Sequence, residues 1–286
     1  MLLTACGGAP QTVPRQPPLV TVASENKTPQ AASLEVAQRP ESDPSLFAAT
    51  SPAAAPAAAS TRVADDMPLS PPINTPLFVD RQSAPSTTWC RAVVHIGDST
   101  STGSMKEAYV GDPDKRLDAQ LSRVGVEESY LELMGGRSLV EHRADHENGV
   151  MVAERLREAG FEGCWIVALG TNDAANVAKH PKVDRVERIE RIMRVIGDDP
   201  VLWVDAITTT QKGYWAAFNM QLWNDDLATT LSGYPNARIY RWSEDIEEEW
   251  WANDGIHYNS KGYTARARYT ADALAAAFPA VKTSGR

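Results

Sequence analysis

From Trp89 onward, short apolar runs alternate with longer stretches in which apolar residues recur at helical spacing. The short runs are bounded by glycine and polar residues, a pattern typical of buried β-strands. We predict strands at 92–96, 130–133, 165–169, 201–205 and 237–240.

Four stretches between and after these strands predict amphipathic helices. Asn148 is suited to cap a helix that runs to Ala159, with Gly160 just past its end. The other three span 184–196, 215–231 and 263–278. Strands that alternate with helices predict a parallel sheet covered on both faces, with functional groups beyond the carboxyl ends of the strands.

The chain before Trp89 differs in composition from the rest. All 8 Trp residues lie at or after position 89, whereas residues 9–88 are rich in Ala, Pro, Ser, Thr and Gln. Such a segment buries too little apolar surface to offset the entropy of ordering it. We therefore predict a disordered linker at 9–88 and a globular domain at 89–286, although a linker that connects to nothing would have the same composition.

The residues Leu3-Thr4-Ala5-Cys6 resemble a bacterial lipobox, in which a peptidase cuts before the Cys and a lipid is attached to its sulfur. This resemblance implies an anchor at residues 1–8, lipidation of Cys6 and an extracytoplasmic place at the bacterial cell membrane. A signal peptide needs a basic and then an apolar region, but only five residues, none of them basic, precede Cys6. Either the recorded start lies inside a longer signal peptide or the match is chance, and the alternative is a cytoplasmic protein with an apolar start.

The formal net charge of −9 argues against a nucleic-acid partner, because binding phosphates needs a basic face. No stretch approaches the roughly 18 apolar residues that span a bilayer. Contact with a membrane is therefore expected only through a lipid on Cys6, and a monomer is the default expectation.

Four polar segments follow predicted strands or lie near the C terminus, and in order they read Gly-Asp-Ser-Thr, Gly-Gly-Arg-Ser, Gly-Thr-Asn-Asp and Asp-Gly-Ile-His. The carboxyl ends of parallel strands meet at one edge of a sheet, so we expect these segments to converge there. Their positions are 97–100, 135–138, 170–173 and 254–257.

The residue types in these segments suit nucleophilic catalysis. A serine hydroxyl is a poor nucleophile unless a base takes its proton, and histidine is the natural base near neutral pH. Ser99 and His257 supply these groups, and Asp254, three residues before the histidine, is placed to fix its tautomer. Backbone N–H groups of Ser99 and Gly136 and the side-chain amide of Asn172 are candidate donors to an oxyanion. This chemistry needs no cofactor and no metal.

In this order, the four segments resemble the SGNH (GDSL) hydrolase superfamily over roughly residues 89–278. The resemblance implies a flavodoxin-like three-layer α/β/α sandwich with a parallel five-stranded sheet in the order 2-1-3-4-5. In the second block, Gly135 and Gly136 both fit the glycine position. The implied catalytic residues are Ser99, Asp254 and His257, and the implied oxyanion hole is Ser99, Gly136 and Asn172.

The chain has three cysteines, Cys6, Cys90 and Cys164. Cys90 precedes the first strand and Cys164 the third, and the strand order implied by the resemblance makes these strands parallel neighbours. Each of the two lies eight or nine residues before an active-site residue, Ser99 or Asn172, so the registers match. We therefore predict a Cys90–Cys164 disulfide, which belongs in an oxidising compartment, with two buried free thiols as the alternative.

Several conspicuous residues have a plainer interpretation. We expect Asp98 to be a structural hydrogen-bonding residue and His95 to be packed within its strand. Most Trp residues are expected in the core, with lining of the substrate pocket by Trp250 and Trp251 as an alternative.

The remaining histidines carry little signal. Glu141-His142 with Asp145-His146 weakly suggests a metal site, but no complete ligand set accompanies them. We expect surface positions for His142, His146 and His180.

Three functions are compatible with these observations. The first is a serine-dependent ester hydrolase of the bacterial envelope that acts on a carbohydrate or lipid ester through an acyl-enzyme on Ser99. The stretch from Val201 to Tyr258 is similar to extracellular SGNH domains that O-acetylate cell-wall polysaccharides, so an O-acyltransferase is the alternative, although this sequence carries no membrane acyltransferase half. A non-catalytic envelope-binding lipoprotein is the second alternative, and the complete set of motif residues argues against it.

Overall fold

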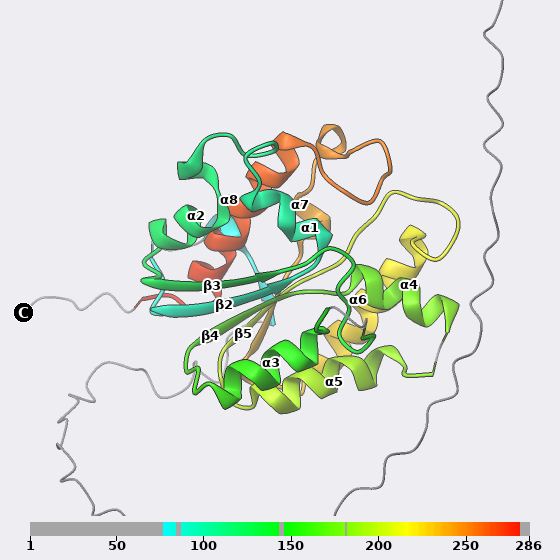
Figure 1. Cartoon of the computed structure of the whole chain (residues 1–286), viewed down its shortest axis with the longest axis horizontal. Coiled ribbons are helices and arrows are strands. Elements are labelled where there is room, and N and C mark those ends of the chain that lie inside the picture. The colour runs from blue at the N-terminus through cyan, green and yellow to red at the C-terminus, as the bar shows by residue number, and fades with distance from the viewer. Residues whose placement is uncertain (1–76, 84–86, 143–145, 181, 281–286) are drawn as a thin grey trace, which may run out of the picture. The chain divides into compact units, whose positions relative to one another are not determined.

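The computed structural model contains one six-stranded sheet in which all neighbouring strands are parallel (Figure 1). It describes residues 77–83, 87–142, 146–180 and 182–280. The strands lie in the order β1-β6-β5-β4-β2-β3. Their bounds are Phe78–Val79 (β1), Ala92–Gly97 (β2), Glu128–Leu133 (β3), Cys164–Ala168 (β4), Val201–Val204 (β5) and Ala237–Tyr240 (β6).

All five predicted strands are present, as β2 to β6, and their order is the predicted one. Counted along the chain, their arrangement β3-β2-β4-β5-β6 is 2-1-3-4-5. The sheet nevertheless has six strands rather than five, because β1 adds to β6 at one edge.

The additional strand β1 comes from the segment that the sequence assigned to the linker. Two residues are too few to show a periodic pattern, and β1 forms through tertiary contacts, with Phe78 opposite Ile239 on β6. Just after it, Arg81 Nε donates to Asp245 Oδ2 at 2.5 Å. The sheet therefore includes residues before Trp89. Residues 1–76, with Cys6 and most of the predicted linker, lie outside the described residues, so the lipid anchor stays a prediction.

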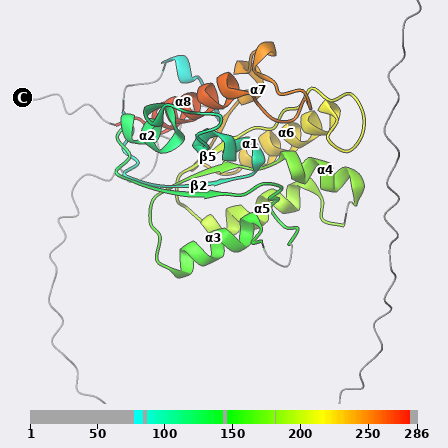
Figure 2. The ribbon, with the colours of Figure 1, turned by 45° about the horizontal axis from the view of Figure 1, so that its top comes forward.

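Helices cover both faces of the sheet, which is the predicted three-layer sandwich (Figure 1, Figure 2). Helices α2 and α8 lie on one face, and α3, α5 and α6 lie on the other. Within the part of the chain that the structure describes, no helix is long and apolar enough to cross a membrane. The α-helices are Ser99–Thr102 (α1), Leu117–Arg123 (α2), Gly149–Glu158 (α3), Thr171–Lys179 (α4), Arg185–Ile196 (α5), Ala217–Leu231 (α6), Trp242–Asp245 (α7) and Ser260–Ala277 (α8). Short 3₁₀ helices span Arg81–Ser83 (η1), Gly103–Met105 (η2), Pro113–Lys115 (η3) and Glu248–Trp250 (η4).

The two cores explain why the strands are apolar without alternation. Successive residues of a strand point to opposite faces, so a sheet covered on both faces needs apolar residues at consecutive positions. Val93 and Ile166 contribute to the core beneath α8, whereas Val94 and Trp165 contribute to the core beneath α3 and α5. All four are fully buried.

Capping residues set the helix ends. Asn148 accepts a hydrogen bond from the Met151 N–H at 2.9 Å, which confirms the predicted start of α3. Helix α8 begins at Ser260 rather than 263, because Asn259 caps it by accepting from the Lys261 N–H at 3.0 Å. Helices α2 and α4 were not predicted, since each is too short to show a clear helical period.

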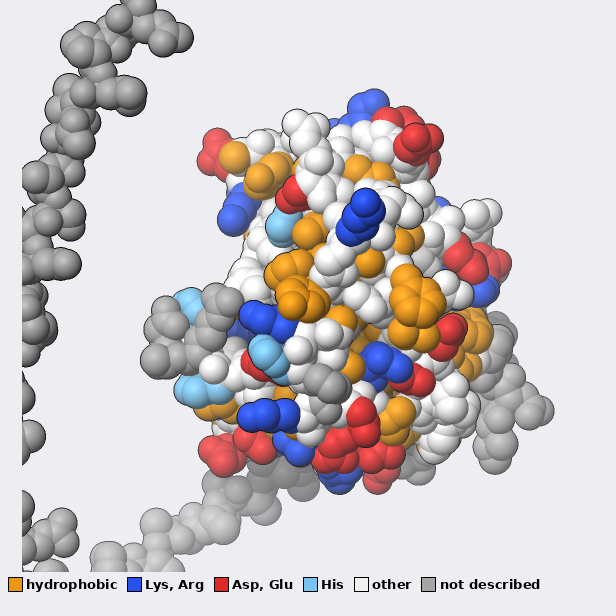
Figure 3. Space-filling view, turned by 90° about the vertical axis from the view of Figure 1, so that its right-hand side faces the viewer, with side chains coloured by type: hydrophobic (Ala, Val, Ile, Leu, Met, Phe, Trp, Pro, Cys, Tyr) orange, Lys and Arg blue, Asp and Glu red, His pale blue; other side chains and the backbone are white. Residues whose placement is uncertain are grey.

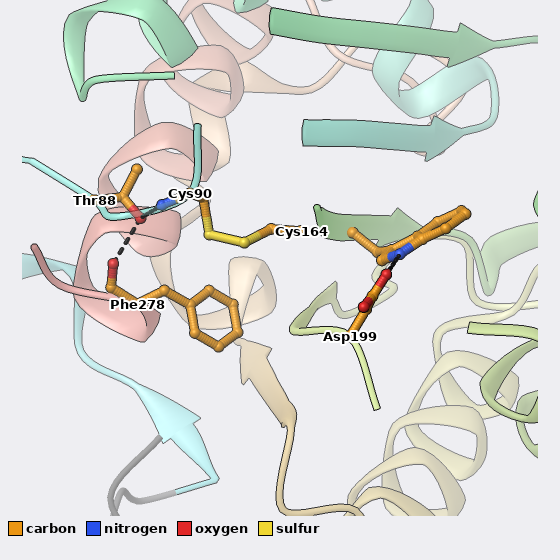
Figure 4. Close-up of a disulfide and its surroundings, with 6 residues drawn as sticks. Thr88, Cys90, Cys164, Asp199 and Phe278 are labelled. Atoms are coloured by element: carbon orange, nitrogen blue, oxygen red, sulfur yellow. Dashed lines mark hydrogen bonds between the residues drawn. A yellow bond between two sulfur atoms is a disulfide. The ribbon is translucent and has the colours of Figure 1, made fainter. Parts of the chain in front are cut away.

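The predicted disulfide between Cys90 and Cys164 is present, with Cα atoms 5.8 Å apart (Figure 4). It joins the segment before β2 to the start of β4, at the end of the sheet opposite to Ser99. Next to it, the Thr88 hydroxyl donates to the Phe278 carbonyl at 2.6 Å, so the end of the last helix is tied to the same corner.

We expect loss of this disulfide to lower the free energy of unfolding by about 2–4 kcal/mol, because the bond restricts the unfolded chain. Urea unfolding of the wild type with and without reductant measures the effect. The Cys90→Ser/Cys164→Ser variant is the control and should match the reduced wild type in both conditions. Equal midpoints for the oxidised wild type and this variant would contradict the prediction.

Candidate active site

The three predicted catalytic residues form one hydrogen-bonded chain. Ser99 is the first residue of α1, directly after β2, and His257 lies in the loop before α8. Ser99 Oγ and His257 Nε2 are 2.9 Å apart. On the other side of the imidazole ring, His257 Nδ1 and Asp254 Oδ2 are 2.6 Å apart. This geometry suits transfer of the Ser99 proton to the imidazole.

Hydrogen bonds keep Asp254 ionised. Burial raises its pKa, but hydrogen bonds from the His257 side chain and from the backbone N–H groups of His257 and Ile256 outweigh burial and lower it to about 2. The two backbone donors each lie 2.9 Å from Asp254 Oδ1. An ionised Asp254 accepts the Nδ1–H of His257, which leaves Nε2 free to accept a proton from Ser99.

The turn between Asp254 and His257 requires a glycine at its centre. Gly255 has φ +66°, and a Cβ atom there would lie 2.5 Å from Thr209 Oγ1. In the observed turn the Thr209 N–H donates to the Gly255 carbonyl at 2.8 Å. The loop after β5 therefore packs directly against the loop that carries the histidine.

The residue before the nucleophile, Asp98, and two side chains of α8 hold Ser99 in place. Asp98 is fully buried and accepts from the backbone N–H and the hydroxyl of Thr100, both at 2.8 Å, as expected for a structural residue. The Tyr263 hydroxyl donates to the Ser99 carbonyl at 3.1 Å, and Arg266 Nη2 lies 3.4 Å from the Thr100 hydroxyl. Sequence reasoning missed Tyr263 and Arg266, because no local pattern links α8 to the nucleophile.

The second block forms a glycine turn beside the nucleophile. Gly136 has φ +73°, a left-handed conformation that favours glycine. A Cβ atom on Gly135 would lie 3.9 Å from Ser99 Cβ. Both glycines border the same cleft, so the choice between them as oxyanion donor stays open.

Asn172, the third predicted oxyanion donor, lies in the first turn of α4. Its Nδ2 donates to Asp98 Oδ2 and to the Arg137 carbonyl, each at 3.1 Å. A primary amide nitrogen carries two hydrogens, and both are engaged. Donation to an oxyanion therefore requires the replacement of one of these two hydrogen bonds.

A buried ion-pair network connects the glycine turn to α4 and α5. Arg188 Nη1 donates to Asp173 Oδ1 at 3.0 Å and to Glu141 Oε2 at 2.6 Å. Asp173 also accepts from the Leu139 N–H at 2.9 Å. Arg188 and Asp173 are both buried, and removal of Arg188 would leave the Asp173 carboxylate without its cationic partner, whereas Arg188 would still pair with Glu141 if Asp173 were removed. The sequence pattern of α5 marked only its apolar face and did not single out Arg188.

A cleft of about 500 Å³ opens beside Gly136 and Asn172. Its far wall includes Tyr214 and Trp215 from the loop before α6. On this side of the molecule, hydrophobic side chains lie among basic and histidine side chains, and most acidic side chains lie around its edges (Figure 3). Further lining residues are Glu141, His142, His146, Glu147, Asn176 and Lys179.

Two of the plainer sequence interpretations can be checked. His95 is 2 % exposed; burial and the nearby Arg266 lower its pKa to about 3, which agrees with a packed, neutral histidine. Trp250 is buried and stacks on Trp242, with ring centroids 6.1 Å apart, and it does not line the cleft beside Asn172. The structure therefore assigns Trp250 to the core.

His142 and His180 are exposed, as expected, and His146 is half-buried. His142 and His146 also line the cleft. Among the described residues, which include Glu141 but not Asp145, no group of three or more His, Cys, Asp or Glu side chains is arranged to hold a metal ion.

Known structures resemble this chain although sequence comparisons do not find relatives. No protein-family model matches the chain, and no curated protein matches its sequence. An inhibitor-bound aryl esterase of M. smegmatis matches with a TM-score of 0.51 at 14 % identity, over 66 % of this chain and 100 % of that chain. A lipase/acylhydrolase from Enterococcus faecalis matches with a TM-score of 0.50 at 14 % identity, over 68 % of this chain and 100 % of that chain.

At this level of identity the likeness concerns the fold. The chain shares the fold of these two solved structures over their whole length. The resemblance that the four sequence blocks indicated is therefore confirmed at the level of the fold.

The lowered pKa of Asp254 predicts a pH-dependent contribution to stability. A carboxyl group whose pKa is lower in the folded state stabilises the protein above its unfolded pKa, about 4, and this contribution is lost as the pH falls toward about 2. Because the side chain is half exposed, we expect Asp254→Asn to reduce the free energy of unfolding by only about 1 kcal/mol near neutral pH.

Urea unfolding of the wild type and Asp254→Asn between about pH 7 and pH 3 measures this contribution. The difference between the two proteins should shrink as the pH falls below about 4. A difference that stays constant or grows toward low pH would contradict the assignment.

Proposed function

We propose that this protein is a serine-dependent ester hydrolase that acts through an acyl-enzyme on Ser99. The observation that carries the proposal is the hydrogen-bonded chain from Ser99 through His257 to Asp254. The fold shared with solved esterases and acylhydrolases is consistent with it.

In the first half of the reaction, Ser99 Oγ attacks the ester carbonyl carbon while His257 Nε2 takes the hydroxyl proton. Backbone N–H groups at Ser99 and at Gly136 or Gly135 stabilise the oxyanion, with the Asn172 amide joining them after it releases Asp98 or the Arg137 carbonyl. The ester C–O bond then breaks, and the protonated His257 gives its proton to the leaving alcohol. Water repeats the sequence on the acyl-enzyme and releases the acid.

The cleft supports a short acyl group on a polar alcohol rather than a long-chain lipid ester. Its lining beside Gly136 and Asn172 is mostly polar or aromatic, and of the described residues that line it only Met134 and Ala175 are aliphatic. A long acyl chain would need a run of aliphatic contacts to offset its transfer from water. We therefore propose an O-acylated carbohydrate as the substrate.

The proposal extends to the cell envelope. A structural disulfide, Cys90–Cys164, is typical of oxidising compartments. It agrees with the lipobox-like sequence at Cys6, which would attach the domain to the membrane through the linker at 9–88. In this proposal the protein is an extracytoplasmic monomer that reaches envelope glycans.

Transfer to a sugar hydroxyl is the second candidate activity. The acyl-enzyme is the same, and only the acceptor differs. The observation that favours keeping this candidate is the volume of the cleft, about 500 Å³, which offers room for an acceptor beside Gly136 and Asn172. A non-catalytic role in envelope binding would leave the ordered Ser99–His257–Asp254 chain without a purpose.

Ser99→Ala should lower kcat/KM for p-nitrophenyl acetate by about 1,000-fold or more, because the nucleophile is lost. His257→Ala should have a similar effect, and Asp254→Asn should reduce the rate through the wrong histidine tautomer. The matched control is Ser122→Ala, an exposed serine on α2, which should retain full activity. Turnover that survives Ser99→Ala would mean that the nucleophile is misassigned.

The wild type should prefer p-nitrophenyl acetate over the octanoate ester by at least about tenfold in kcat/KM, because the lining offers few aliphatic contacts to a long chain. A preference for octanoate would overturn the carbohydrate-ester proposal in favour of a lipid substrate. With an oligosaccharide acceptor added, mass spectrometry distinguishes free acetate from an acetylated sugar.

A further inference from the structure

The aromatic wall of the cleft is exposed but firmly held. Tyr214 and Trp215 are 45 % and 39 % exposed, so both rings are accessible to a ligand in the cleft that they line. Their backbone is fixed from both sides: the Thr208 hydroxyl donates to the Trp215 carbonyl at 2.6 Å, and Asn219 Nδ2 donates to the Tyr214 carbonyl at 2.9 Å. The two rings are thus presented by an ordered loop, at low entropic cost to a ligand.

This loop is also tied to the loop that carries His257. The Thr209 N–H donates to the Gly255 carbonyl at 2.8 Å, and the Ala217 N–H donates to the Thr210 carbonyl at the same distance. The aromatic wall therefore has a fixed position relative to the reacting atoms.

One face of helix α4 forms another side of the cleft. The lining residues Asn172, Ala175, Asn176 and Lys179 are spaced by three, one and three positions, which places them on one side of the helix. With a rise of about 1.5 Å per residue, Lys179 lies about 10 Å along the axis from Asn172. That is the scale of one sugar ring with its substituents. Lys179 Nζ is 5.9 Å from the centre of the Tyr214 ring.

The charges that line the cleft are unequally paired. Glu141 receives hydrogen bonds from Arg188, and Glu147 from Arg155 at 2.9 Å, so both carboxylates are compensated. Lys179 has no carboxylate partner among the described residues. A cation next to an exposed aromatic pair therefore faces the cleft, one helix length from the oxyanion residues.

We infer that this cleft selects an O-acylated sugar that carries a carboxylate, and that Lys179 is the residue that recognises the charge. The inference rests on the proposed esterase function. The C–H groups on one face of a pyranose pack against Tyr214 and Trp215, while the sugar carboxylate pairs with the Lys179 ammonium group. The ester then lies toward Asn172 and Ser99. Lys179 and the two aromatic residues act in binding and specificity, and none of them takes part in the acyl transfer.

Two monoacetylated methyl hexosides that differ only in the exocyclic group test the inference on the full chain. One is a glucoside with a hydroxymethyl group, and the other is a glucuronoside with a carboxylate. The wild type should favour the glucuronoside by about tenfold in kcat/KM, the size of one charge-assisted hydrogen bond. Lys179→Gln should bring this ratio to about one. A ratio of two rates is insensitive to a general loss of activity.

Two matched variants separate the roles in the cleft. Lys212→Gln removes an exposed lysine near the aromatic pair but outside the cleft lining and should keep the preference. Trp215→Ala should raise KM for both sugars by about tenfold and leave the ratio intact. Phe218→Ala, which removes a 64 % exposed aromatic residue outside the lining, should change neither value.

Equal rates on the two sugars, or a preference that survives Lys179→Gln, would overturn the inference. The proposed esterase function would still stand if turnover of p-nitrophenyl acetate depends on Ser99. If no ester is turned over, the esterase fails, and calorimetric binding of both sugars to Ser99→Ala decides the inference alone. Tighter binding of the glucuronoside, lost with Lys179→Gln, supports it, and equal binding overturns it.

Discussion

The proposed activity depends on one hydrogen bond, between Ser99 Oγ and His257 Nε2, which joins residues 158 positions apart in the sequence. Neither group performs the chemistry alone, because an isolated serine hydroxyl is almost inert. The parallel sheet sets one partner by ending β2 at Gly97, directly before the nucleophile. Helix α8 sets the other, because it packs across the same sheet and carries the histidine loop at its start.

Buried polar groups hold the site together, although their burial is itself unfavourable for stability. Asp98 is buried between Thr100 and Asn172, so one carboxylate links the nucleophile turn to the oxyanion side. Asp173 and Arg188 do the same for the glycine turn. Burying such charges is unfavourable unless each is paired and hydrogen-bonded. Their presence beside the active site suggests that they are kept for the geometry they impose on the loops, rather than for stability.

The parts predicted from the sequence are those with local signals. Buried parallel strands appear as continuous apolar runs. The disulfide followed from the strand order that the family resemblance implied, together with the matching registers of its two strands. The missing parts depend on contacts between distant residues. Strand β1 exists only by pairing with β6, and Tyr263, Arg188 and Lys179 acquire their roles from what the fold places beside them. No spacing in the sequence marks such residues.

The most direct measurement of the central claim is covalent labelling of the hydroxyl that His257 activates. The full chain is treated with an organophosphorus fluoride at neutral pH, and the adduct is located by peptide mass spectrometry. The account predicts a single adduct on Ser99, formed rapidly by the wild type and at least about 100-fold more slowly by His257→Gln. An adduct on another serine, or labelling of Ser99 at the same rate without the imidazole, would contradict it.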